Sequence, residues 1–141
     1  MQGEFHSTIA NQLEELVGLA RDVNAFLEAN DAPMEAAYTV ELLMEEVLTN
    51  IVKYTYDDQR RHQISVTLKL SPELAAITIA DDGHPFDPLS TADPDIDKPI
   101  AERQIGGLGL FLVRKMSNSA AYRREGGKNI LDLTVKLRKS A

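Results

Sequence analysis

The chain of 141 residues contains no cysteine and no tryptophan, and only 6% of its residues are aromatic. Without cysteine it can form neither a disulfide framework nor a reactive thiolate. No apolar run approaches the roughly 18 residues that a membrane-spanning helix needs, so we expect no membrane span. The N-terminal stretch has no basic flank and no unbroken apolar segment, so we expect no signal peptide. Together these absences predict a cytoplasmic protein.

Positive charge is also scarce: 15 Lys and Arg residues face 22 Asp and Glu residues, which gives a net charge of -7. Proteins bind nucleic acid largely by neutralising its phosphates, so this deficit argues against a nucleic-acid partner. An anionic ligand would need local donors and a metal ion. The chain does have 43% apolar residues, and its length is typical of one domain, so we predict a single domain over residues 1–141.

Hydrophobic periodicity predicts the elements of this domain. Apolar residues recur at helical spacing from about Asn11, with Glu14 as a candidate capping-box partner, to Asn30. Further helices are predicted over 33–54 and 107–117. Alternating or apolar runs predict strands over 2–9, 64–70, 74–80, 120–124 and 130–137. Because strands come in hairpins with helices between them, we predict an α+β two-layer sandwich: a mixed, mostly antiparallel sheet with helices on one face.

A long segment rich in proline and aspartate separates the second hairpin from the last predicted helix. Loops of this length in a compact domain are usually functional lids or disordered. We therefore predict a lid over residues 84–106, which would order over a bound ligand.

The second predicted helix carries a polar stripe formed by Glu46, Thr49, Asn50 and Lys53. A solvated helix face would explain this stripe without any function. Asparagine, however, is a mediocre helix former, because it competes for backbone hydrogen bonds. A functional stripe would offer the Asn50 carbonyl to magnesium, the Glu46 carboxylate to a proton and the Lys53 ammonium to a phosphate.

Two glycine-containing motifs follow. Asp81-Asp82-Gly83 ends a predicted strand, where a carboxylate can accept a hydrogen bond from an amine such as that of adenine, and glycine permits close approach. The alternative is an ordinary Asp-Gly turn. Gly107-Leu108-Gly109 opens the last predicted helix, where free backbone N–H groups form an anion site; the alternative there is a flexible hinge. In this order and spacing, the motifs indicate an ATP pocket.

Together these motifs resemble the Bergerat-fold ATPases of the gyrase, chaperone, histidine-kinase and MutL superfamily. The chain looks specifically like the small anti-sigma factor serine kinases of bacteria. The asparagine box reads Glu46-x-x-x-Asn50, the first glycine box runs over 81–88 and ends in Pro-Phe-Asp-Pro, and the second runs over 107–113. The resemblance covers nearly the whole chain, including the leading strand and the first helix.

The resemblance implies ATP and Mg²⁺ as cofactors, with Glu46 as the catalytic base, Asn50 as the magnesium ligand and Asp81 as the acceptor for the adenine amine. The positions that match the cofactor-binding residues are Asn50, Lys53, Tyr54, Asp81, Gly83, Phe86, Gly107, Leu108, Gly109 and Leu110. It also implies a homodimer that binds a sigma factor and phosphorylates an anti-sigma-factor antagonist of the STAS type. Arg21 matches the first-helix arginine that grips the sigma factor; a solvated, carboxylate-paired Arg21 is the alternative.

Two departures bear on this interpretation. Lys53-Tyr54-Thr55 looks more like histidine kinases, whereas Pro85, in place of the second glycine of the histidine-kinase box, favours the anti-sigma branch. We therefore predict a serine/threonine kinase that also sequesters a partner. The alternatives are an ATP-dependent binding module without phosphotransfer and a histidine-kinase-like catalytic domain. The last is disfavoured, because residues before 41 leave no room for a helix pair that carries a phospho-acceptor histidine.

Overall fold

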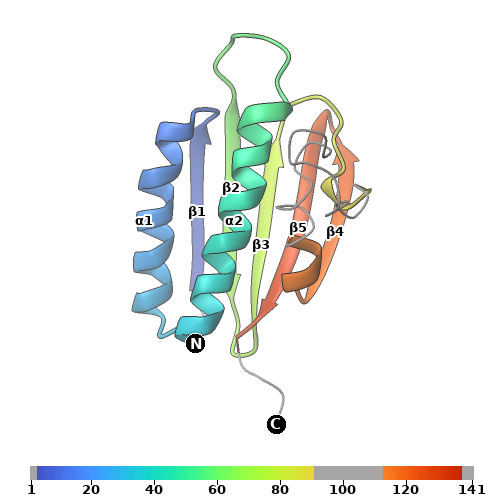
Figure 1. Cartoon of the computed structure of the whole chain (residues 1–141). Helices are drawn as coiled ribbons and strands as arrows, with labels where there is room; N and C mark the ends of the chain where they lie inside the picture. Colours follow the sequence, from blue (N-terminus) through green and yellow to red (C-terminus); the bar gives the residue numbers. More distant parts are fainter. Residues whose placement is uncertain (1–2, 91–112, 138–141) are drawn as a thin grey trace, which may run out of the picture.

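The computed structural model describes residues 3–90 and 113–137, which form a sheet covered by helices (Figure 1). The predicted elements within these ranges are all present. The strands are β1 (Gly3–Ala10), β2 (Gln63–Leu70), β3 (Leu74–Asp81), β4 (Ser119–Glu125) and β5 (Lys128–Lys136). The helices are α1 (Leu13–Ala29) and α2 (Met34–Tyr54), with a short 3-10 turn η1 (Pro88–Ser90) and a helical turn over Val113–Met116.

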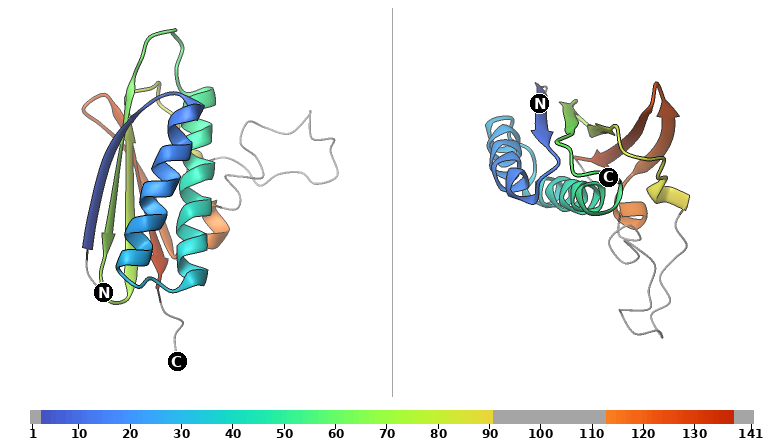
Figure 2. Two further views of the ribbon diagram at one scale, coloured as in Figure 1. Left: turned by 90° about the vertical axis from the view of Figure 1, so that its left-hand side faces the viewer. Right: turned by 90° about the horizontal axis from the view of Figure 1, so that it is seen from above.

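The sheet has five strands in the order β1-β2-β3-β5-β4, and every pairing among them is antiparallel. Both α1 and α2 lie on the same face of it, as the side view and the view from above show (Figure 2). The predicted α+β two-layer sandwich is therefore confirmed. Because β5 inserts between β3 and β4, the end of β3 lies beside the start of β5, and Asp81 pairs with Asn129 in the register.

Alternation along the strands explains why the helices cover only one face. Every second residue of β2, β3 and β5 is buried, and the residues between them are half-buried or exposed on the other face. The helices contribute Leu27, Val40 and Leu43, which are fully buried against the sheet. Burying one such side chain contributes about 1.5–3 kcal/mol. The core thus lies between the sheet and its helical layer.

The predicted capping box at the start of the first helix is wrong. Asn11 instead bonds across the chain: its backbone N–H donates to the His62 carbonyl at 3.1 Å, and its Oδ1 accepts from the His62 N–H at 2.8 Å. Helix α1 begins two residues later, after Gln12, which makes no side-chain cap. Asn11 therefore fastens the β1–α1 corner to the beginning of β2, a long-range contact that local spacing does not reveal.

Candidate nucleotide-binding site

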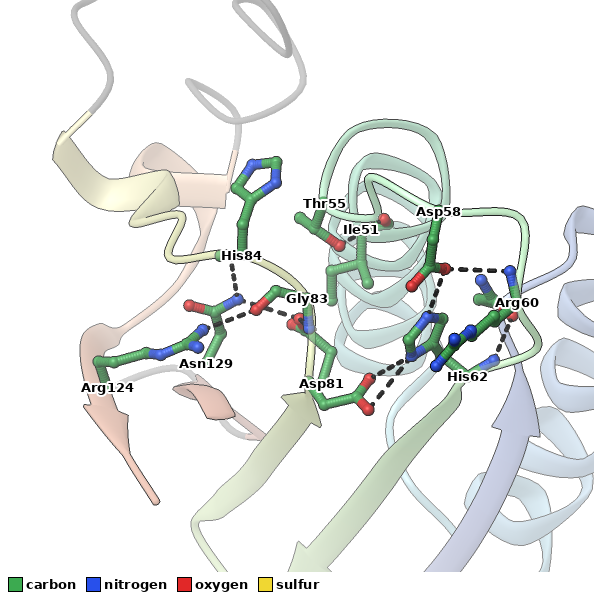
Figure 3. Close-up of polar contacts among 12 residues, drawn as sticks. Ile51, Thr55, Asp58, Arg60, His62, Asp81, Gly83, His84, Arg124 and Asn129 are labelled. Atoms are coloured by element: carbon green, nitrogen blue, oxygen red, sulfur yellow. Dashed lines mark hydrogen bonds and ion pairs between the residues drawn. The ribbon is translucent and has the colours of Figure 1, made fainter. Parts of the chain in front are cut away.

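The carboxyl end of β3 and the second half of α2 face a common cavity, with the start of β5 beside them (Figure 3). Among the predicted site residues, the cavity brings together Asn50 from α2, Asp81 from β3 and Phe86 from the loop that follows β3. The other lining residues are Val47, Ile51, Thr55, Ile79, Pro88, Tyr122, Asn129 and Leu131. The cavity is mostly apolar with a few polar groups, and among the described residues it encloses about 20 Å³, the space of about one water molecule.

Asp81 is buried, with 3% of its surface exposed. Its Oδ1 accepts hydrogen bonds from the Gly83 backbone N–H at 2.9 Å and from Asn129 Nδ2 at 3.0 Å. Burial raises the pKa of Asp81, and these two hydrogen bonds oppose that shift. Within residues 3–90 and 113–137, no donor reaches Oδ2. One carboxylate oxygen is therefore held by the protein, and the other can accept a hydrogen bond from a ligand.

Asn129 is a site residue that the sequence analysis did not predict. Its Nδ2 also donates to the His84 carbonyl at 2.8 Å, while its Oδ1 accepts from the Phe86 N–H at 3.1 Å and from the Tyr122 hydroxyl at 2.6 Å. This buried amide therefore joins β5 and β4 to the loop after β3. Its position in the sequence could have revealed it, because Asn129 occupies an inward-facing position of β5, and the other inward-facing positions hold Leu or Val.

Gly83 is required by a close approach to α2. A Cβ at this position would lie 2.5 Å from the Thr55 carbonyl oxygen and 2.7 Å from Thr55 Oγ1, closer than real Cβ atoms come. The next residue, His84, donates its backbone N–H to the same Thr55 carbonyl at 2.8 Å. Arg124 Nη1 donates to the Gly83 carbonyl at 2.7 Å. The glycine thus lets the end of β3 lie against the C-terminus of α2.

Replacing Gly83 by alanine is expected to destabilise the fold by about 1–3 kcal/mol, because the added methyl group must displace backbone atoms of Thr55. The matched control is Gly18→Ala in α1, where the nearest atom lies 3.9 Å from the added Cβ. That exchange should be neutral or stabilising by up to about 1 kcal/mol, since alanine is the better helix former. Urea unfolding of both variants measures the difference. Equal stability of the two would show that the approach at Gly83 relaxes without cost.

Asn50, which lines the same cavity as Asp81, has a buried side-chain oxygen without a described hydrogen-bond partner. The side chain is 6% exposed, and its Nδ2 donates to the Glu46 backbone carbonyl at 2.7 Å. Its Oδ1 is buried and has no hydrogen-bond partner in the part of the chain that the structure describes. Burying an unsatisfied carbonyl is costly, and amide oxygens are ligands that magnesium prefers. The residue present therefore fits the predicted magnesium ligand.

The remaining predicted residues differ in where they lie. Glu46 is half-buried one helical turn before Asn50, whereas Lys53 and Tyr54 are exposed on the last turn of α2 and do not line the described cavity. Arg21 is exposed on α1. Gly107, Leu108, Gly109 and Leu110 lie outside the described residues, as does most of the predicted lid over 84–106. The roles of these residues remain predictions.

His62 forms a cluster with Asp58, Asp82 and Tyr56 beside the site. His62 Nε2 lies 2.8 Å from Asp58 Oδ1, and its Nδ1 lies 3.1 Å from Asp82 Oδ1. The ring stacks on Tyr56 with 4.5 Å between centroids. The hydrogen bonds to Asp58 and Asp82 raise the pKa of His62, and the bond from His62 lowers the pKa of Asp58. The cluster links the α2–β2 loop to the residue that follows Asp81.

This cluster predicts a pH-dependent stability. The pKa of His62 is higher in the folded than in the unfolded protein, so protonated His62 stabilises the fold. This stabilisation is complete below the unfolded pKa of about 6.5 and is lost as the pH rises through the folded pKa. The melting temperature of the wild type should therefore exceed that of His62→Phe most at about pH 6 and least at about pH 9. Phenylalanine keeps a ring that can stack on Tyr56, so stacking is matched. A difference that does not vary with pH would exclude the charge of His62 as its cause.

The sequence can now be compared with known proteins. The sequence model of the histidine kinase-like ATPase domain matches residues 9–135, from the end of β1 to β5. The chain is 32% identical over 97 residues to the serine/threonine-protein kinase BtrW of Bordetella bronchiseptica, covering 69% of this chain and 68% of that protein. It is 25% identical over 122 residues to the serine-protein kinase RsbW of Oceanobacillus iheyensis, covering 83% of this chain and 77% of that protein.

A solved structure agrees in fold. The RsbU and RsbW domains of Rv1364c from Mycobacterium tuberculosis superpose with a TM-score of 0.67 at 13% identity, over 99% of this chain and 34% of that one. The chain belongs to the histidine kinase-like ATPase domain family, which implies that it binds ATP. Its relatives in that family include the serine kinases BtrW and RsbW, so the predicted resemblance to the anti-sigma factor serine kinases is confirmed. Among the described helices, none is long and apolar enough to cross a membrane.

Proposed function

We propose that the chain is an ATP-dependent serine/threonine protein kinase that also sequesters a sigma factor and phosphorylates an anti-sigma-factor antagonist of the STAS type. The observation that carries the proposal is that Asn50 and Asp81 line one cavity and that each has a side-chain oxygen without a described donor: Asn50 Oδ1, which is buried, and Asp81 Oδ2. The kinase names of the relatives support the same chemistry.

In this proposal each site residue has a separate role. Asp81 accepts a hydrogen bond from the adenine amine, and Asn50 holds Mg²⁺. The metal supplies charge neutralisation on the phosphates of ATP. Glu46 takes the proton of the substrate hydroxyl as that oxygen bonds to the γ-phosphorus and ADP leaves. The remaining nucleotide contacts are assigned to Lys53 and Tyr54 at the end of α2, to Phe86, and to the segment Gly107–Leu110.

Labelled ATP distinguishes this proposal from its alternatives. The protein is incubated with γ-labelled ATP, magnesium and a STAS-domain antagonist, and the product is analysed for acid-stable phosphate on serine or threonine. Transfer to the antagonist is the expected result. ATP binding without transfer would support a binding module, and acid-labile phosphate on histidine would support a histidine-kinase-like domain.

We further propose that Arg21 contributes to the grip on the sigma factor. Arg21 is exposed on α1 and makes no ion pair with the described residues, which argues against the alternative of a carboxylate-paired surface arginine. Arg21→Ala should weaken sigma-factor binding by about tenfold or more and leave ATP affinity unchanged. The matched control is Lys69→Ala, which removes an exposed positive charge from the sheet face opposite the helices. Equal binding by both variants in a pull-down would assign Arg21 to the solvated surface.

The predicted homodimer is tested by sedimentation of the wild type.

A further inference from the structure

A second, larger groove lies between α1 and α2, and every residue that lines it comes from these two helices. Its volume is about 480 Å³, within the range of specific binding sites. The two helices run side by side over the same face of the sheet (Figure 2). Glu45 and Thr49 line this groove, whereas Asn50 lines the nucleotide cavity, so α2 borders two separate sites.

The α1 side of the groove is apolar and open to solvent. Leu16, Leu19 and Val23 line it, and Val17 and Leu13 on the same side are 73% and 46% exposed. Single exposed apolar residues are ordinary on protein surfaces. Here, however, they continue into a groove that is itself apolar, with Met44 and Leu48 contributed by α2. Contiguous exposed apolar surface of this kind marks interaction sites.

The α2 side of the groove is acidic. Glu41 and Glu45 lie one helical turn apart and both line the groove. Neither makes an ion pair with any residue that the structure describes. Like charges at this spacing destabilise a helix, so an incoming cation would relieve repulsion as well as form an ion pair.

We propose that this groove binds an amphipathic helix of a partner protein, whose apolar face packs on α1 and α2 and whose Lys and Arg residues meet Glu41 and Glu45. Helix-in-groove recognition uses this combination of apolar anchors and flanking charge. The stretch of α1 from Leu13 to Val23 measures about 15 Å along its axis, enough for about three turns of a bound helix. The inference requires neither ATP nor phosphotransfer, and it rests on the proposed function only in that both place a partner protein on α1, the helix that carries Arg21.

A second copy of this chain fits the groove less well. The charged residues of the described helical layer are mostly acidic: Glu14, Glu15, Asp22, Glu28, Glu35, Glu41, Glu45 and Glu46 against Arg21 and Lys53. A contact that places two such layers together brings like charges face to face, which costs association free energy. A basic amphipathic helix avoids this repulsion.

Two synthetic helical peptides test the proposal on the full chain. The basic peptide has leucines at helical core spacing flanked by lysines, and the acidic peptide has each lysine replaced by glutamate. By calorimetry, the basic peptide should bind at least about tenfold more tightly than the acidic one. Val17→Asp should abolish this binding, while Met34→Asp, at an exposed position outside the groove, should not. The double variant Glu41→Lys/Glu45→Lys should reverse the preference.

The peptide measurements would overturn the proposal if they showed no binding of the basic peptide, equal binding of both peptides, or unaltered binding by a folded Val17→Asp variant. A wild-type dimer that Val17→Asp converts to monomer would assign the groove to a second copy and would also overturn it. Circular dichroism checks that each variant is folded. ATP affinity, measured on the same preparations, reports separately on the nucleotide site, so its loss would count against the kinase proposal and not against the groove.

Discussion

Asp81→Asn is expected to lower the affinity for ATP by about a hundredfold or more, which corresponds to about 2.7 kcal/mol. The Gly83 N–H and Asn129 Nδ2 both donate to Asp81 Oδ1, so they would hold the amide oxygen of the new residue in that place. Its NH₂ group must then replace Oδ2. The NH₂ group of the new asparagine would then face the adenine amine. Because both groups are hydrogen-bond donors, no hydrogen bond would form and adenine would bind weakly.

The control is Asp82→Asn, the same chemical change at the neighbouring residue. Asp82 is exposed and its carboxylate contacts His62. The ATP affinity of the Asp82→Asn variant should therefore stay near that of the wild type. Calorimetric titration of both variants with ATP and magnesium measures the contrast. Wild-type affinity in Asp81→Asn would mean that this carboxylate does not receive the adenine amine.

Glu46→Gln is expected to slow phosphotransfer by about 10²–10⁴ with little change in ATP affinity. A serine hydroxyl is a poor nucleophile at neutral pH, and glutamine keeps the size of the side chain while removing the base. The position of Asn50 should survive the exchange, because its Nδ2 donates to the backbone carbonyl of residue 46 and not to the side chain. The substitution therefore separates catalysis from binding.

Glu45→Gln provides the matched control, since it removes one carboxylate from the preceding position of the same helix. Glu45 is exposed and lines the groove between the helices, so its loss should leave the transfer rate unchanged. Transfer rates are measured with saturating ATP and the antagonist as acceptor. If Glu46→Gln transfers phosphate as fast as the wild type, another residue is the base.

Much of the fold was predictable because local pattern and tertiary burial agree. Alternation along residues 64–70 and 130–137 predicts strands with one buried face, and β2 and β5 bury every second residue. The helical spacing of Leu43, Val47 and Ile51 predicts one face of α2, and all three side chains are buried. Tyr54 has the same helical spacing but is 39% exposed, and it is the last residue of α2.

The site was predictable only in part. Asn50 and Asp81 belong to motifs whose residue types suit metal and adenine, and the structure brings both to one cavity. The residues that orient Asp81 could not be found in this way. Asn129 is 48 residues from Asp81 along the chain, and it becomes a neighbour only because β5 pairs with β3.

The sequence by itself determined which residues form helices and strands, which of their faces are apolar, and which motifs carry nucleotide chemistry. These properties depend on residue type and on spacings of a few residues, which backbone geometry converts directly into a face. Only the tertiary structure decided that Thr55 approaches Gly83 too closely for an unstrained Cβ and that Asn11 bonds to His62. It likewise decided that α1 and α2 leave a groove between them. Such contacts depend on how distant segments pack, and no local period encodes the separation of two elements.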